Sequence, residues 1–167
     1  QCQQTAHNSG CEGRAGVCGK KSDTANYQDE LTGALIGLSR AVRKKLALNP
    51  DASFEHADEL ILKGLFTTIT NVNFFNDTII KLIHEVNVEK DRIYPDIMNY
   101  DVRHIWEDQE DIRSLKSLIL FGLRGMAAYA YHAYALDYVY KNVLDFFYEG
   151  SKPLLRKRAV TNYLHSY

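Results

Sequence analysis

Apolar residues recur at intervals of three and four along most of the chain, which is the spacing of amphipathic α-helices. The pattern predicts helices over residues 26–46, 53–69, 76–94, 111–134 and 137–148. No alternating apolar and polar run is long enough to predict a sheet. Because short connections favour antiparallel neighbours, we expect an all-α protein, an antiparallel helical bundle of the three-helix-bundle type.

Polar residues stand where these helices should begin. Positions 22–24 are expected to cap the first helix, Ser53 the second, and Asn76 or Asp77 the third. Between the second and third helices the sequence breaks into Asn71-Val72-Asn73, where the asparagines are expected to cap turns, followed by two phenylalanines of a type usually buried. A polar stretch before residue 110 leaves room for one short helical turn.

Composition narrows the function classes. The chain has 46% hydrophobic and 25% charged residues, and its 20 basic and 21 acidic residues give a net charge of −1. Such a balance offers no electrostatic basis for binding nucleic acid or an anionic membrane. The longest uncharged run, residues 64–76, is too short and too polar to cross a bilayer. We therefore expect neither a nucleic-acid partner nor a membrane.

The three cysteines are the most informative residues. Cys2, Cys11 and Cys18 all lie at the start of the chain, in a segment with a glycine at every third position from 10 to 19. An odd, clustered set does not suit a disulfide framework. A glycine-rich loop can wrap thiolates around a metal, so the pattern favours an iron–sulfur cluster. Zinc, which normally shows tighter cysteine pairs, and three free thiols are the alternatives.

An iron–sulfur cluster usually takes four thiolates, one more than this chain carries. The chain begins at Gln1 rather than Met, without a signal-type segment. We therefore expect a few upstream residues, with a fourth cysteine among them. His7, inside the cysteine loop, is the alternative fourth ligand.

Three blocks of sequence carry a family resemblance. The first runs QCQQTA at 1–6, VCGK at 17–20 and DTANYQDEL at 23–31. The second is LFTTITNVNF at 65–74, and the third, weaker, is LFGLRGMAAY at 120–129. Together they resemble, in the same order, the N-terminal helical domain of the hybrid-cluster (prismane) proteins, the hydroxylamine reductase family.

The resemblance implies a function. It implies an iron–sulfur oxidoreductase that reduces hydroxylamine or nitric oxide, with this chain as its N-terminal electron-relay domain. Cys2, Cys11 and Cys18 would hold a [4Fe–4S] cluster, or a [2Fe–2S] cluster. No catalytic residue is expected in this chain, and a hybrid Fe–S–O cluster only if later domains exist. The alternatives are a stand-alone iron–sulfur electron-transfer or redox-sensing module, and the N-terminal part of a carbon-monoxide-dehydrogenase-like protein.

The expected organisation is a cluster-binding loop over residues 1–22, a helical bundle over 23–150, and a basic tail or the start of a missing segment over 151–167. The resemblance implies a redox partner of NADH-linked reductase or ferredoxin type and missing C-terminal domains, and leaves a homo-oligomer open. Cluster-type thiols favour a reducing cytoplasm. A tyrosine stripe is expected to serve core and interface packing rather than docking. Its members are Tyr129, Tyr131, Tyr134, Tyr138 and Tyr140.

Overall fold

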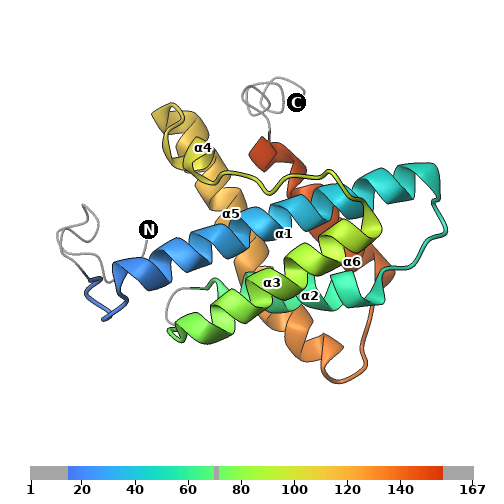
Figure 1. Ribbon diagram of the computed structural model, residues 1–167, viewed down its shortest axis with the longest axis horizontal. Coiled ribbons are helices and arrows are strands. Elements are labelled where there is room, and N and C mark those ends of the chain that lie inside the picture. Colours follow the sequence, from blue (N-terminus) through green and yellow to red (C-terminus); the bar gives the residue numbers. More distant parts are fainter. Residues whose placement is uncertain (1–14, 70–71, 156–167) are drawn as a thin grey trace.

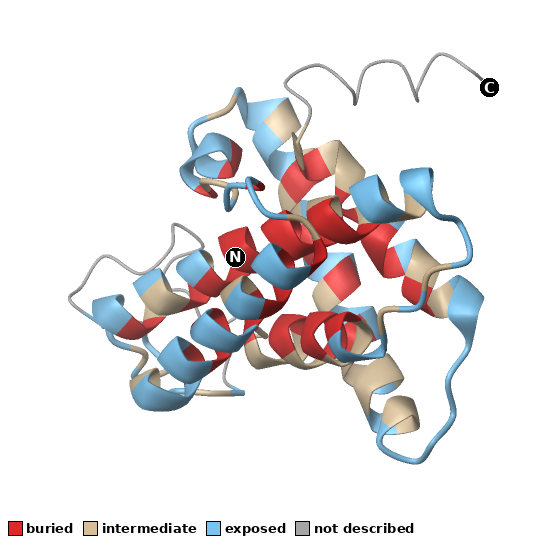
Figure 2. Cartoon of the chain, turned by 45° about the vertical axis from the view of Figure 1, so that its right-hand side comes forward, coloured by how far each residue is buried: buried red, intermediate tan, exposed pale blue. Residues whose placement is uncertain are grey.

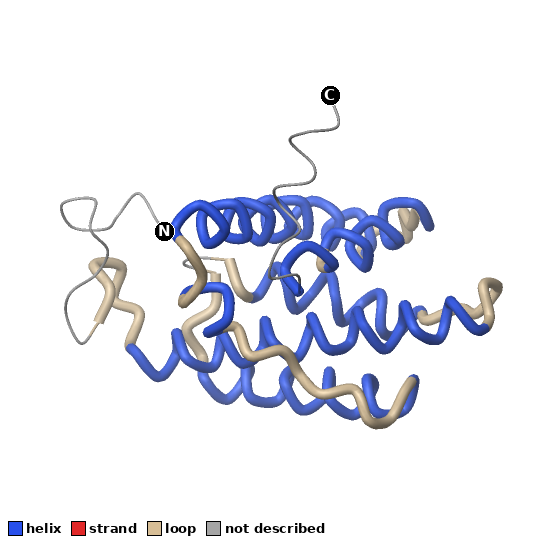
Figure 3. The backbone as a smooth tube through the Cα atoms, turned by 90° about the horizontal axis from the view of Figure 1, so that it is seen from above, coloured by secondary structure: helices blue, strands red, loops and turns tan. Residues whose placement is uncertain are grey.

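The computed structural model describes residues 15–69 and 72–155, and it confirms the all-α class (Figure 1). The described residues contain helices, turns and one isolated bridge between Ala15 and Lys21, and no strand (Figure 3). The elements in chain order are α1 Ser22–Leu48, α2 Glu55–Thr67, α3 Asn76–Ile93, α4 Arg103–Trp106, α5 Glu110–Tyr134, α6 Lys141–Gly150 and the 3₁₀ helix η2 Lys152–Leu155.

Helix α1 is the centre of the bundle. Every residue from 31 to 39 is buried, so two and a half turns of this helix are covered on all sides. α3 lies alongside α1, and α2 and α6 also contact it (Figure 1). Buried positions gather on the inward faces of the helices and exposed positions on the outward ones (Figure 2). The main core therefore forms around α1.

Small residues allow this close approach. A methyl group at Gly33 would collide with the backbone oxygen of Tyr100, whose N–H donates to the Gly33 carbonyl at 3.0 Å. At Gly64, on α2, a methyl carbon would lie 2.6 Å from a methyl carbon of Leu35. The connection after α3 and the helix α2 thus both rest directly on α1 where glycines leave room.

The second half of the chain packs against this centre. α5 contacts α2 along much of its length, and a small second core joins α1, α4, α5 and η2 through Ile36, Ile105, Leu120 and Leu154. The Tyr100 hydroxyl donates to the Leu154 carbonyl at 3.0 Å. The first residues after position 150 therefore pack on the bundle.

The helix starts differ from the expected ones. The N-cap residues are Lys21, Phe54 and Phe75, none of which makes a side-chain capping bond. The prediction of caps at 22–24, Ser53 and Asn76 was therefore wrong. The polar residues around α1 and α3 bond to each other between helices, and that contact cannot be read from local sequence.

The last connection also differs. A helix was expected from residue 137, but α6 begins at Lys141. Asp137 has a φ of 62°, a left-handed conformation that a helix cannot continue through, and Tyr138 donates back to the Ala133 carbonyl at 3.0 Å. Residues 135–140 therefore connect α5 to α6.

Candidate functional site

Of the three predicted ligands, the structure describes one. Cys18 lies in the turn that precedes α1, as a partly buried free thiol. Cys2, Cys11 and the alternative ligand His7 lie outside the described residues. The prediction that the three thiols share one metal site therefore stays a prediction.

The turn around Cys18 is closed by its own backbone. The Gly16 N–H donates to the Lys20 carbonyl at 2.7 Å, and the Gly19 N–H donates to the Gly16 carbonyl at 2.8 Å. Gly19 has a φ of 86°, which residues with side chains rarely adopt. The closure places Cys18 at the tip of the turn, and the glycines on either side of it make this sharp reversal feasible.

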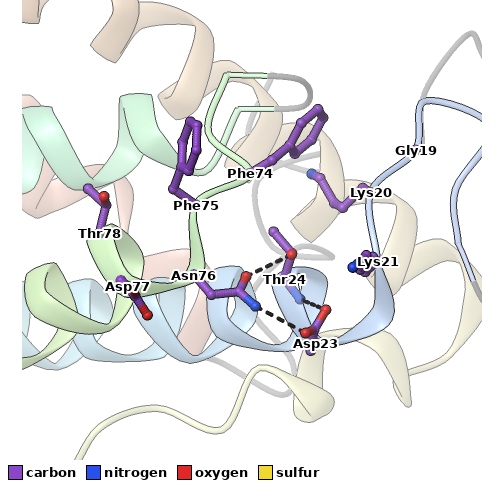
Figure 4. Close-up of a pocket in the computed structure, with 10 residues that line it drawn as sticks. All are labelled: Gly19, Lys20, Lys21, Asp23, Thr24, Phe74, Phe75, Asn76, Asp77 and Thr78. Carbon is purple, nitrogen blue, oxygen red and sulfur yellow. Dashed lines mark hydrogen bonds between the residues drawn. The ribbon is translucent and has the colours of Figure 1, made fainter.

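This turn is fastened to the loop that begins α3. The Lys20 ammonium donates to Gln28 Oε1 at 2.6 Å and lies 5.7 Å from the centre of the Phe74 ring. The Gln28 amide nitrogen in turn donates to the Asn73 carbonyl at 3.0 Å. Two sequence blocks that lie about fifty residues apart, VCGK and TNVNF, are thus neighbours in space, as Lys20 and Phe74 show in Figure 4. Sequence reasoning had treated them as separate signals.

A pocket of about 460 Å³ opens between these two segments (Figure 4). One wall consists of residues 19–21, 23 and 24 and the other of residues 74–78. At its floor Thr24 donates to Asn76 Oδ1 at 2.7 Å, and the Asn76 amide donates to Asp23 Oδ2 at 3.0 Å. These bonds tie the first turn of α1 to the first turn of α3, beside the Cys18 turn.

The expectations for the break between α2 and α3 are settled in part. Asn73 caps a turn, because its side-chain oxygen accepts from the Phe75 N–H at 2.8 Å, while Asn71 lies outside the described residues. Phe74 and Phe75 are 42% and 77% exposed, so the expectation of two buried aromatics was wrong. Both face the pocket, where Phe74 meets the Lys20 cation instead of an apolar core.

A partly buried polar group that sequence reasoning missed lies between α5 and α1. Arg124 reaches from α5 and donates to Thr68 Oγ1 and Thr32 Oγ1, both at 2.9 Å. Burial lowers the pKa of Arg124 to about 10, against the opposing charge of Asp29. Burial also raises the pKa of Asp29, opposed by the charge of Arg124 and a hydrogen bond from Trp106. The only local signal was a charged residue within the apolar block LFGLRGMAAY.

The donors near Cys18 suit a soft metal. A thiolate on a glycine-flanked turn is the ligand type that iron–sulfur clusters use. Within residues 15–69 and 72–155, no three His, Cys, Asp or Glu side chains lie together as a metal site. Cys18 is therefore a lone thiol among the described residues, and Cys2 and Cys11 lie outside them.

The tyrosine stripe divides into two kinds. Tyr131 and Tyr134 pack against the core, as expected. Tyr129, Tyr138 and Tyr140 are 83%, 64% and 64% exposed, so they do not pack in the core of the described chain, and interface packing stays a prediction for them. They border an apolar pocket of about 320 Å³ between α5 and α6, which Leu62 and Val143 also line.

None of the helices in the described part of the chain combines the length and apolar character needed to cross a bilayer.

Comparison with known proteins gives one consistent result. The model of the Prismane/CO dehydrogenase family matches residues 1–164. A hydroxylamine reductase of Caldanaerobacter subterraneus subsp. tengcongensis is 37% identical over 174 residues, covering 87% of this chain and 31% of that protein. Hydroxylamine reductases of Thermoanaerobacter pseudethanolicus (38% identical, 87% and 31% covered) and Petrotoga mobilis (35%, 94% and 35%) are similar. The chain spans about a third of the length of these curated relatives.

Proposed function

The chain belongs to the Prismane/CO dehydrogenase family, and from this premise we propose that it is the N-terminal electron-relay part of an iron–sulfur oxidoreductase that reduces hydroxylamine or nitric oxide. The observation that carries the proposal is the free thiol of Cys18 at the tip of a glycine-flanked turn, fastened to the loop before α3. The names of the relatives support this reading over a stand-alone electron-transfer or sensing module, and over a carbon-monoxide-dehydrogenase-like protein.

The cysteines carry the chemistry of this part. Cys2, Cys11 and Cys18 bind iron through their thiolates, in a [4Fe–4S] cluster by preference and a [2Fe–2S] cluster as the second choice. The cluster, when bound, accepts and releases single electrons. The turn from Gly16 to Lys20 orients the Cys18 thiolate, and Lys20 brings a cation into the same turn. Nearby hydrogen bonds and charge adjust the potential of such clusters.

We assign the catalytic cluster and the supply of electrons to segments or proteins other than this chain. In this proposal the hybrid Fe–S–O cluster and the reduction of the substrate belong to the two-thirds of the full-length protein that this chain does not span. Electrons arrive from a redox partner of NADH-linked reductase or ferredoxin type. Free, metal-binding thiols suit the reducing cytoplasm, where we place the protein.

The decisive experiment replaces Cys18, the proposed ligand that lies within the described residues. Cys18→Ser should lower both the visible iron–sulfur absorbance and the iron content of the reconstituted full-length protein, because a hydroxyl replaces the thiolate ligand. The helices should stay folded, because the turn buries no side chain and Val17 is 65% exposed. Absorbance, iron analysis and circular dichroism measure the three outcomes.

Val17→Ala is the matched control, because it changes the neighbouring residue without removing a ligand. It should keep both iron and absorbance. Undiminished iron and absorbance in Cys18→Ser would exclude Cys18 as a ligand. Loss of helix signal in Cys18→Ser would show instead that the turn is an integral part of the bundle.

We further propose that the outward face of α5 is covered by the rest of the full-length polypeptide. Leu118, Phe121 and Tyr129 are 67%, 63% and 83% exposed along this face. Between them lie Gly122 and Gly125, where a methyl group would meet nothing within 4 Å. Mid-helix glycine disfavours a helix by about 1 kcal/mol relative to alanine, so two without an internal packing reason indicate close contact with another segment.

Hydroxyl-radical footprinting tests this cover. Phe121 and Tyr129 should be oxidised in the 167-residue chain and protected in the full-length protein at a concentration where it is monomeric. Tyr131, which packs on the core, serves as the internal control and should be protected in both. Equal oxidation of Phe121 in both proteins would refute the assignment, and protection that appears only at dimer-forming concentrations would assign the face to a second copy.

A further inference from the structure

Gln28 joins the two segments beside Cys18 through a single side chain. It lies on the second turn of α1 and is 5% exposed. Its oxygen accepts from the Lys20 ammonium at 2.6 Å, and its nitrogen donates to the Asn73 carbonyl at 3.0 Å. One amide thus connects a residue eight positions before it to a residue 45 positions after it.

Both ends of the amide are needed. The carboxamide presents an acceptor to the Lys20 cation and a donor to the Asn73 carbonyl at the same time, which neither a carboxylate nor an apolar side chain does. The site is buried, so a side chain without these groups would leave polar atoms unsatisfied. Glutamate at this position would keep the acceptor and lose the donor, which separates the two connections experimentally.

The Cys18 turn has no apolar anchor to replace this connection. No side chain between residues 15 and 21 is fully buried, and Val17 points largely into solvent. The turn is closed internally by the Gly16–Lys20 and Gly19–Gly16 bonds, which do not attach it to the bundle. Its attachments to the bundle include the start of α1, the contact of Lys20 with Phe74, and the bond from Lys20 to Gln28.

A neighbouring set of hydrogen bonds connects α1 to α3 without involving the Cys18 turn. Thr24, Asn76 and Asp23 tie α1 to α3 across the floor of the pocket (Figure 4). Thr24 lies one helical turn before Gln28 and is equally buried, at 3% exposure. Its bond to Asn76 does not involve the Cys18 turn. It therefore offers a matched control for a purely structural contribution of a buried α1 hydrogen bond.

From this arrangement we propose that Gln28 is the positioning residue of the Cys18 ligand. It sets where the turn and the Lys20 cation stand relative to the loop at residues 73–76, and through them the potential of the metal centre. The part that concerns the metal centre rests on the proposed function. The part that concerns the position of the turn does not.

The first measurement needs no metal. In Gln28→Leu, the amides of Gly16 and Gly19 should exchange their hydrogens at least about tenfold faster, because the turn loses its hydrogen bond from the Lys20 cation. Gln28→Glu should restore slow exchange at these amides, because Lys20 keeps its acceptor. Thr24→Val should leave them within about twofold of the wild type.

The second measurement uses the iron-loaded protein. Gln28→Leu should retain iron but shift the midpoint potential and the electron paramagnetic resonance spectrum of the reduced centre. Thr24→Val should change neither. Gln28→Glu should bring the spectrum back toward the wild type, because it keeps the Lys20 cation in place.

The outcomes separate the two proposals. Unchanged exchange at Gly16 and Gly19 in Gln28→Leu, or equal acceleration in Thr24→Val, would overturn the positioning role. A changed exchange rate with an unchanged potential would overturn its link to the metal. If the wild-type full-length protein takes up no iron–sulfur centre at all, the proposed function fails, while the exchange experiment still decides whether Gln28 positions the turn.

Discussion

Helices α1 and α5 are similar in length, with 27 and 25 residues, but they occupy opposite situations. α1 is buried without interruption from residue 31 to 39, including Thr32 and Ser39. α5 buries only Lys116, Leu120, Leu123 and Ala127, about one face. A helix covered on all sides belongs to the centre of a domain, whereas α5 keeps a face that the described chain does not cover.

The glycines of the two helices show the same contrast. A methyl group at Gly33 of α1 would collide with the backbone of Tyr100, and one at Gly37 would lie 3.0 Å from the side chain of Asn99. At Gly122 and Gly125 of α5 it would meet nothing within 4 Å. The same residue type therefore serves internal packing in one helix and an outward surface in the other.

The largest expected change in the free energy of unfolding comes from comparing a buried leucine of α1 with an exposed leucine of α5. Leu38→Ala in α1 removes a fully buried side chain and should lower the free energy of unfolding by about 2–5 kcal/mol. Leu118→Ala on the outward face of α5 should change it by less than about 0.5 kcal/mol. Urea denaturation measures both. Equal effects would show that the outward face of α5 is buried in solution.

The next test concerns the crowded glycine. Gly33→Ala should lower the free energy of unfolding by about 1–3 kcal/mol, because the connection that carries Tyr100 must move away from α1. The loss of the bond from the Tyr100 N–H to the Gly33 carbonyl should also appear as faster exchange at that amide. A neutral result would mean that this connection adapts without strain.

The pH dependence of stability tests the contact between α5 and α1, where Arg124 lies near the carboxyl group of Asp29. Burial raises the pKa of Asp29 above 3.8, so the folded state favours its protonated form. The wild type should therefore be most stable relative to Asp29→Asn below about pH 4. It should lose that advantage as the pH rises through the raised pKa, by about 1.4 kcal/mol for each unit of the shift. Urea denaturation from pH 3 to 7 measures the difference, and a pH-independent difference would contradict it.

The smallest expected effect is a stabilisation, whereas the leucine and Gly33 substitutions above destabilise the chain or leave it nearly unchanged. Gly125→Ala in α5 should raise the free energy of unfolding of this chain by about 0.5–1 kcal/mol, because alanine favours a helix and the methyl group has open space. In the full-length protein the gain should vanish or reverse, because the proposed covering segment needs that space. A gain of equal size in both proteins would argue against a cover over Gly125.

Prediction from sequence succeeded where the signal was local. The spacing of Leu31, Leu35, Leu38 and Val42 predicts a helix, and all four lie in the core. Prediction from sequence failed where a polar residue could either cap its own helix or bond to a residue of another helix. Asn76 stands where a cap is expected, but it bonds to Thr24 and Asp23 of another helix. For the candidate site, the sequence singled out Cys18 as a ligand, whereas Gln28 appeared only within the DTANYQDEL block, because nothing in the local sequence shows which residues a glutamine side chain bonds.

The sequence by itself determined the helical class, the approximate extent of each long helix, and the clustering of the cysteines, because each depends on residues close together in the chain. Only the tertiary structure decided that the VCGK turn lies against the TNVNF loop, that Phe75 is exposed, and that α1 rather than α5 is enclosed. Burial depends on which elements pack together, and the contacts responsible join residues such as Thr32 and Arg124, 92 positions apart.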